Sequence, residues 1–181
     1  MPEDLAKCLP YIFTLLEGFN IAILKSAGYE ADDVIGTLAR KAEEAGFMTY
    51  MMTPDKDFGQ LVTDRIHIYK PARLGNGAEK LGPAEVCKRY EIQRPEQVID
   101  ILGLMGDAVD NIPGIPGVGE KTAITLIKDF HSIENLLENT DKLKGKLKEK
   151  VEQNKEKALF SKRLATIMID APVELIEEDL R

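Results

Sequence analysis

The sequence has 181 residues, of which 44% are hydrophobic and 30% charged, a composition typical of a soluble globular protein with one core or one core and a small added module. No apolar run reaches the ~18 residues that a membrane-spanning helix needs, and the N-terminus lacks the pattern of a signal peptide. We therefore expect a cytoplasmic protein that does not bind membranes. The two isolated cysteines, Cys8 and Cys87, are expected to be buried free thiols.

The net charge of −7 is unevenly distributed along the chain. Between Asp141 and Arg163 there are nine Lys or Arg residues and four acidic residues, so this segment carries +5 and the rest of the chain carries −12. A basic segment favours a surface that binds a polyanion, and the acidic remainder favours a site that holds cations.

The first 70 residues alternate predicted helices with predicted strands. Apolar residues spaced three and four apart, or short apolar runs, predict helices over 3–19, 31–45 and 57–62 and buried strands over 21–24, 47–53 and 66–70. Gly46 stands where a helix C-terminal glycine is common, and the methionines at 48–52 are expected to lie in the core. Residues 71–82 contain three glycines and a proline, which predict a loop or hairpin. The alternation indicates a parallel sheet covered by helices.

After Pro83 the strand signals stop. The remaining apolar periodicity predicts helices over 83–90, 95–106, 120–130, 132–138 and 146–165. We therefore predict an α/β fold in two parts, with a sheet-containing part over 1–82 and an all-helical module over 83–181. The two or three predicted strands are few for a doubly wound sheet, so we expect the N-terminal portion of the sheet to be missing from this sequence.

Three short acidic clusters stand out. They are Glu30, Asp32 and Asp33 in GYEADD, Asp55 and Asp57 in TPDKD, and Asp107 and Asp110 in GDAVDN. The first two clusters adjoin predicted strands whose carboxyl ends meet at one edge of a parallel sheet. Asp55 and Asp57 would point the same way in an extended chain, whereas Asp107 and Asp110 would share a face of a helical turn.

Seven carboxylates that converge would repel one another strongly unless cations lie between them. Mg²⁺ and Mn²⁺ prefer carboxylate oxygens, and two such ions form the usual device for phosphodiester cleavage. The clusters therefore predict a site for Mg²⁺ or Mn²⁺. The alternative is structural, because an aspartate between a strand and a helix is a common N-cap.

The stretch GIPGVGEKT, Gly114–Thr122, nearly matches a nucleotide-binding P-loop. It follows a predicted helix instead of a strand, and the additional Glu120 breaks the spacing, so we expect no nucleoside triphosphate at this loop. Gly117 and Gly119 would adopt positive φ and let the backbone approach a phosphate, and the helix that begins at Glu120 offers free N–H groups. Such a loop grips the backbone of DNA without reading its bases. The alternative is a plain glycine turn between packed helices.

These motifs together resemble the 5′-nuclease (flap endonuclease-like) domain of bacterial DNA polymerase I. The segments GYEADDVIGTLARKA, TPDKDFGQLV and DILGLMGDAVDNIPGIPGVGEKTA occur in the order and spacing of that family, and the resemblance runs from about residue 2 to about residue 175. It implies a three-layer, PIN-like α/β nuclease core, present here in part, followed by a helix–three-turn–helix module. It also implies a structure-specific 5′-3′ exonuclease that trims 5′ flaps and RNA primers during DNA replication and repair.

The resemblance also implies roles for individual residues. Glu30, Asp32 and Asp33 would mostly serve a first metal ion, and Asp55, Asp57, Asp107 and Asp110 a second. The hairpin loop would hold K⁺ through its carbonyls and contact the phosphates of a flapped or nicked duplex. The residues expected to make the DNA contact are Gly114, Gly117, Val118, Gly119, Lys121 and Thr122.

The family's first two aspartate-bearing strands and its basic helical arch have no counterpart in this sequence. We therefore expect a fragment of a larger polymerase I, one that folds its helical module and binds DNA weakly but cleaves poorly or not at all. Two other readings remain open: a non-catalytic DNA-binding module, and a PIN-like ribonuclease, which gives no reason for the glycine loop.

Overall fold

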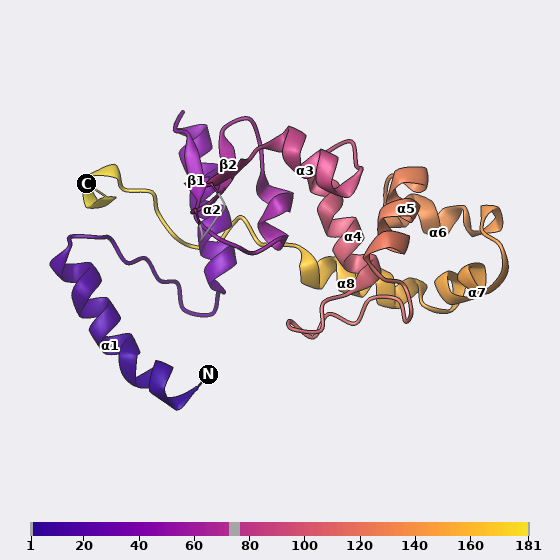
Figure 1. Cartoon of the computed structure of the whole chain (residues 1–181), viewed down its shortest axis with the longest axis horizontal. Helices are drawn as coiled ribbons and strands as arrows, with labels where there is room; N and C mark the ends of the chain where they lie inside the picture. The colour runs from indigo at the N-terminus through magenta and orange to yellow at the C-terminus, as the bar shows by residue number, and fades with distance from the viewer. Residues whose placement is uncertain (1, 73–76, 181) are drawn as a thin grey trace.

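The computed structural model describes residues 2–72 and 77–180 and has an elongated shape, with a small sheet towards one end and a group of helices at the other (Figure 1). The helices are α1 (Glu3–Gly18), α2 (Ala31–Glu44), α3 (Pro83–Tyr90), α4 (Val98–Met105), α5 (Glu120–Phe130), α6 (Ile133–Glu138), α7 (Gly145–Gln153) and α8 (Lys155–Ala165). The strands are β1 (Thr49–Met51), β2 (Ile66–Lys70) and β3 (Glu79–Leu81). Short 3₁₀ helices include η1 (Asp57–Leu61) and η2 (Pro95–Gln97).

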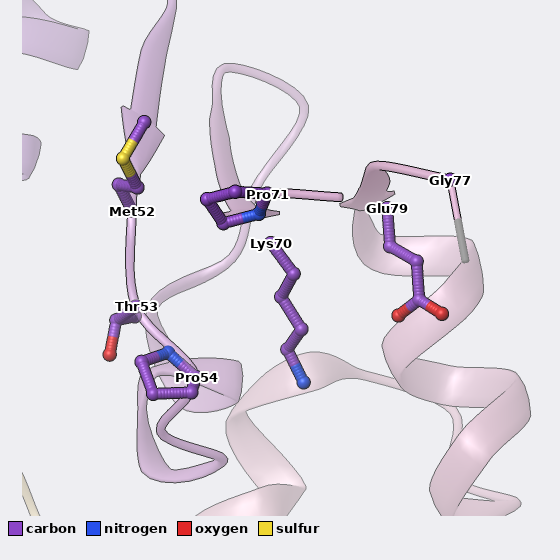
Figure 2. A pocket seen from close by; sticks show the side chains of 7 residues that line it. All are labelled: Met52, Thr53, Pro54, Lys70, Pro71, Gly77 and Glu79. Carbon is purple, nitrogen blue, oxygen red and sulfur yellow. The ribbon is translucent and has the colours of Figure 1, made fainter. Parts of the chain in front are cut away.

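The sheet has the order β1-β2-β3. Strands β1 and β2 are parallel, with Thr49 opposite Ile66, whereas β2 and β3 are antiparallel, with Lys70 opposite Glu79. The predicted hairpin over 71–82 is therefore present as the β2–β3 pair, and its middle, 73–76, lies outside the described residues. Helix α2 packs on β1 and β2, and a cavity opens where these two parallel strands end (Figure 2).

Three of the sequence predictions about elements are wrong. Residues 21–24 form no strand, because within the described residues their backbone has no neighbouring strand with which to pair, and Ile21 and Leu24 are exposed. The strand predicted over 47–53 shortens to the edge strand β1, in which Met51 is buried, and Met48 and Met52, which flank it, are exposed and not in the core. The helix predicted over 146–165 is two helices, α7 and α8, interrupted at Asn154.

The cysteines are free, as predicted, but they are not both buried. Cys8 is exposed on α1, and Cys87 is half-buried on α3. Helix α1 has no buried residue and lies apart from the remainder of the chain (Figure 1). Among the described residues, none of the helices combines the length and the apolar character needed to span a bilayer.

One cluster of buried apolar side chains runs from the sheet into the helical module, from Ile66 and Ile68 to Leu104 and Ile127. Helix α4 lies at its centre and packs against α5, α8 and η1. An ion pair of 2.6 Å between Lys162 of α8 and Asp100 of α4 holds these two helices together. This packing fixes both ends of the loop that joins α4 to α5, and that loop carries the second part of the candidate site.

The segment after α8 returns to the sheet-containing part. Gln60 of η1 donates from its side-chain amide to the carbonyl of Ala165 and accepts from the Ile167 N–H, at 2.9 Å each. Further along, the Ala171 N–H donates to the Thr37 hydroxyl of α2 at 3.0 Å. These hydrogen bonds tie the last helix to the first part of the chain and hold η1 beside α4.

Candidate metal centre and nucleic-acid interface

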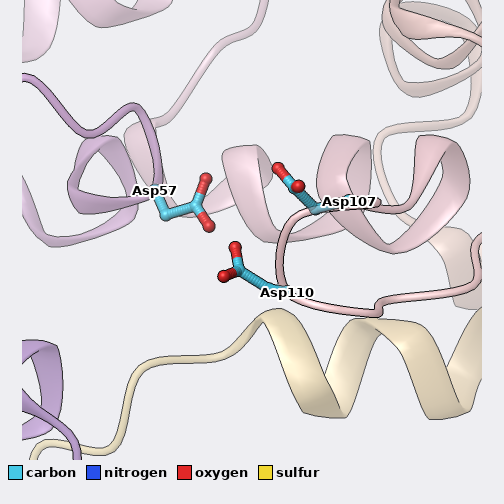
Figure 3. Close-up of side chains that lie close together, drawn as sticks. All are labelled: Asp57, Asp107 and Asp110. Carbon is cyan, nitrogen blue, oxygen red and sulfur yellow. The ribbon is translucent and has the colours of Figure 1, made fainter. Parts of the chain in front are cut away.

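Three carboxylates from two separate segments lie together. Asp57, Asp107 and Asp110 each offer an oxygen atom, and these oxygens all lie within 4.8 Å of one another. Figure 3 shows the three side chains pointing into a common space between η1 and the loop after α4. Asp57 and Asp107 are half-buried, whereas Asp110 is exposed, so the cluster opens to solvent on one side.

The local geometry of these acids differs from the sequence prediction. Asp55 and Asp57 do not lie in an extended chain, because Asp57 begins η1 and its N–H donates to Asp55 Oδ1 at 3.0 Å. Asp107 and Asp110 do not share a helical face, because α4 ends at Met105. They lie instead on a tight loop that Asp107 and Ile112 close with two backbone hydrogen bonds of 2.7 and 2.9 Å.

Two glycines pinch the base of this acidic loop. Gly106 and Gly114 both adopt positive φ, 72° and 57°, and their backbones touch. A Cβ atom on Gly106 would lie 2.5 Å from the carbonyl oxygen of Ile112, a distance that no side chain tolerates. The Gly114 N–H is buried and donates to the Ser161 hydroxyl of α8 at 3.0 Å. Helix α8 therefore anchors the segment that carries Asp107 and Asp110.

Asp57 is the electrostatically strained member of the cluster. Partial burial, followed by repulsion from Asp55, Asp107 and Asp110, raises the pKa of Asp57 from 3.8 to about 6. Its Oδ1 atom is buried and has no hydrogen-bond partner among the described residues. A buried carboxylate oxygen without a donor is costly, and a bound cation would remove that cost.

Lys56 is a site residue that the sequence analysis did not identify. Its ammonium lies 2.6 Å from Asp107 Oδ2, and this hydrogen bond holds the pKa of Asp107 below its usual value. The only signal in the sequence is the position of Lys56 between Asp55 and Asp57, which did not indicate that its partner lies some fifty residues away. Lys56 offsets part of the negative charge, yet it makes no contact that satisfies Asp57 Oδ1.

The first acidic cluster does not join the group of three. Asp33 Oδ2 accepts from the Glu30 N–H at 3.2 Å, and its Oδ1 accepts from the Met168 N–H at 2.9 Å, so Asp33 has a capping role at the start of α2. Partial burial raises the pKa of Asp32, and the negative charges of Asp33 and Asp55 raise it further. Glu30 is exposed. The charge of Asp55 therefore acts on both clusters, since it raises the pKa of Asp32 and of Asp57.

The donor set fits a hard divalent cation. Oxygens of three carboxylates converge, one of them lacks any donor, and one side of the cluster is open to water. Mg²⁺ and Mn²⁺ bind through one or more carboxylates and keep several water ligands. The cluster contains no thiol or imidazole, the ligands that softer metals prefer.

The loop before α5 follows directly from the acidic loop. Gly117 has positive φ, 74°, as predicted, but Gly119 does not, since its φ is −98°. Helix α5 begins at Glu120, so its first N–H groups are free at this end. Gly119 and Lys121 are exposed, whereas Val118 is buried and faces the core. The exposed part of the loop is therefore a run of backbone at a helix N-terminus.

Lys150 completes this surface, and the sequence analysis did not single it out. A Cβ atom on Gly117 would collide with the Lys150 ammonium, so this cation of α7 lies directly over the glycine loop. Lys150 is half-buried and makes no ion pair with any described residue. The basic segment 141–163 was the available signal, but it could not show which of its nine cations faces the loop.

Comparisons with known proteins assign this architecture. Residues 1–91 match the 5′-3′ exonuclease N-terminal resolvase-like domain, and residues 93–181 match the 5′-3′ exonuclease C-terminal SAM fold. A DNA polymerase I of Bacillus subtilis (strain 168) is 49% identical over 175 residues, which are 96% of this chain and 20% of that protein. The chain spans about a fifth of the length of the curated relatives it matches.

Solved structures share the fold at lower identity. The bacteriophage T5 5′-exonuclease with bound zinc ions is 19% identical and has a TM-score of 0.74. The match covers 91% of this chain and 62% of the T5 chain. A second structure is a bacteriophage T5 flap endonuclease in a pseudo-enzyme-product complex with DNA and metal ions. It is 21% identical and has a TM-score of 0.66, and the match covers 76% of this chain and 50% of the T5 chain. With the two domain matches, which together take in nearly every residue, the conclusion is that this chain belongs to the 5′-3′ exonuclease family.

Proposed function

We propose that this chain supplies the metal-binding and DNA-binding surfaces of a structure-specific 5′-3′ nuclease that hydrolyses phosphodiester bonds in 5′ flaps and primers during DNA replication and repair. The observation that carries the proposal is the convergence of Asp57, Asp107 and Asp110, with one unpartnered oxygen, immediately before a glycine loop suited to phosphate. Membership of the 5′-3′ exonuclease family supports it, as do the DNA and metal ions bound in the T5 complex. We place the protein in the cytoplasm.

Asp57, Asp107 and Asp110 would hold Mg²⁺ or Mn²⁺, with Asp55 nearby. We assign Glu30, Asp32 and Asp33 to the other ion, the first of the two named above, at the start of α2. Divalent ions there would supply Lewis-acid stabilisation of developing negative charge and an activated water. Other residues of the chain would hold these acids in place. Lys56 pairs with Asp107, and the close contact between Gly106 and Gly114 fixes the loop that carries Asp107 and Asp110.

The DNA contact is proposed for the surface that combines the glycine loop with Lys150, in the helical module over 83–181. Gly117, Gly119, Lys121 and Thr122 offer backbone N–H groups and one cation at the start of α5, which suits a phosphate of the DNA backbone and not its bases. Gly114 and Val118 are buried and would act by shaping the loop. We propose K⁺ at the carbonyls of this loop and no nucleoside triphosphate.

Replacing Lys150 by Ala is expected to weaken binding to a nicked duplex about three- to tenfold for every base sequence tested, because one phosphate contact is lost. The slope of log affinity against log salt concentration should fall by about one. Fluorescence anisotropy over a range of salt concentrations measures both. Lys7→Ala on α1 is the matched control, since among the described residues Lys7 pairs only with Glu3, on an exposed helix. Equal losses in the two variants would refute the assignment of Lys150.

Cleavage separates this function from a second candidate, a non-catalytic DNA-binding module. The second candidate is favoured by two contacts that use acids structurally, Lys56 with Asp107 and Asp33 with the Glu30 N–H. With a 5′-flap substrate and Mn²⁺ we expect only weak cleavage from this chain, and that cleavage should depend on the metal and fall at least about a hundredfold in Asp110→Asn, with DNA affinity retained. Wild-type protein that binds the flap, never cuts it and takes up no Mn²⁺ at the cluster of Asp57, Asp107 and Asp110 would support the non-catalytic module instead.

A further inference from the structure

A cavity of about 460 Å³ lies at the carboxyl ends of the two parallel strands. Its lining includes Thr53 and Pro54, which follow β1 (Figure 2). It also includes Lys70, the last residue of β2, and Pro71, which follows it. Glu79, the first residue of β3, lies on the opposite side. Asp55 and Asp57 come directly after Pro54, so the cavity adjoins the acidic site along the same sheet edge. Its volume is within the range of sites that bind small molecules or single units of a polymer.

Lys70 is the charged group whose position the fold does not explain. In Figure 2 its side chain extends into the space between Pro54 and Glu79. Lys70 is half-buried, and within the described ranges its ammonium has no ion pair or hydrogen bond, even with Glu79, its partner in the β2–β3 ladder. An ammonium that faces a cavity and has no partner among the described residues is available to bind an anionic ligand.

A small crevice joins this cavity to the acidic site. It has a volume of about 20 Å³, and its lining includes the cations Lys56, Lys70 and Arg89, the acids Asp55 and Glu85, and Tyr90. Tyr90 is 3% exposed, and among the described residues its hydroxyl has no hydrogen-bond partner. A space of this size holds one water or one ligand oxygen. Three cations, of which Lys56 is paired with Asp107, thus outnumber two carboxylates around a place for a single oxygen atom, beside an unpartnered hydroxyl.

We propose that the cavity and the crevice form a subsite for one nucleotide of a single strand, next to the phosphodiester at the acidic cluster. Lys70 and Arg89 bind the phosphate of that nucleotide, and one phosphate oxygen accepts a hydrogen bond from the Tyr90 hydroxyl. The nucleoside lies in the cavity against Pro54 and Pro71. This subsite rests on the proposed nuclease function and adds to it the path of the strand beyond the acidic residues.

The test uses ¹⁵N-labelled chain and a 5′-phosphorylated thymidine tetranucleotide, titrated by NMR in the presence of EDTA so that no metal contributes. In the wild type we expect the amide resonances of Thr53 and Tyr69 to shift on binding. Lys70→Met should weaken affinity about three- to tenfold and lower the salt slope by about 0.7, the value for one phosphate on a single strand. Lys70→Arg should restore most of the affinity.

Lys80→Met is the matched control, because Lys80 is on the neighbouring strand but contacts the Tyr50 ring and hydroxyl instead of the cavity. The subsite would be refuted if Lys70→Met left the affinity unchanged. It would also be refuted if the amide resonances of Gly117 and Gly119 shifted on binding while those of Thr53 and Tyr69 did not. Either result would leave the proposed DNA contact intact. A wild-type protein that binds neither the tetranucleotide nor a nicked duplex would overturn both proposals.

Discussion

Replacing Asp57 by Asn is expected to raise the free energy of unfolding of the metal-free protein by ~1–2 kcal/mol and to abolish its stabilisation by Mn²⁺. The pKa of Asp57 is raised to about 6, and each unit of such a shift corresponds to about 1.4 kcal/mol at pH 7. The expected gain in unfolding free energy is smaller than the full pKa shift would give, because the side chain is only half-buried and solvent screens its charge. Asparagine keeps the shape, removes the repulsion and removes a metal ligand at the same time.

Thermal unfolding with and without Mn²⁺ measures both effects. In the wild type, Mn²⁺ at a hundred times its dissociation constant should add about 2.7 kcal/mol of stability. Asp64→Asn is the control, because Asp64 is an exposed acid near η1 that lies outside the cluster. If Asp57→Asn loses stability in metal-free buffer, or still gains stability from Mn²⁺ as the wild type does, the cluster is not the metal site.

Replacing Gly114 by Ala is expected to destabilise the fold by ~2–4 kcal/mol and to weaken metal and DNA binding together. Gly114 has positive φ, where alanine is disfavoured by about 1 kcal/mol. Its Cβ would also collide with the backbone of Met105 and Gly106, and overpacking of this kind costs about 1–3 kcal/mol. The same displacement would move Asp107 and Asp110, because the pinch at Gly106 and Gly114 closes their loop.

Gly119→Ala separates this packing role from contact with phosphate. Gly119 has negative φ, and no described atom would lie within 4 Å of a Cβ there, so its unfolding free energy should change by less than about 0.5 kcal/mol. Urea denaturation of both variants gives the comparison. Equal stability of Gly114→Ala and the wild type would show that the loop tolerates a side chain at its base, contrary to the packing described above.

The helices were the most predictable part of the fold. Amphipathic spacing placed α2, α3 and α5 within a residue or two of their bounds, because each buries one apolar face against the core. Strands depend on partners that lie far along the sequence, and this explains why the two strand predictions, over 21–24 and 47–53, were wrong. Residues 21–24 have the composition of a strand but no partner among the described residues, and residues flanking Thr49–Met51 have no ladder to extend β1.

For the site, residue types and clustering were predictable, whereas geometry was not. Asp57 in TPDKD and both acids in GDAVDN converge, whereas Asp55 and the acids of GYEADD lie outside that group, and neither doubled pair has the backbone conformation that its spacing suggested. Lys56 and Lys150 were not identified because the partner of each, Asp107 and Gly117, is brought close only by tertiary packing. Charge patterns indicate which chemistry is present, and long-range contacts decide which atoms meet.

The most direct test of the metal centre is anomalous scattering from crystals of this chain soaked in Mn²⁺. We predict a Mn²⁺ peak within about 2.5 Å of carboxylate oxygens from Asp57, Asp107 and Asp110, with Asp57 Oδ1 among the ligands. The peak should be lost in Asp57→Asn crystals soaked in the same way. Saturating Mn²⁺ that leaves this cluster empty, or that binds only elsewhere on the chain, would contradict the metal centre and the nuclease function proposed from it.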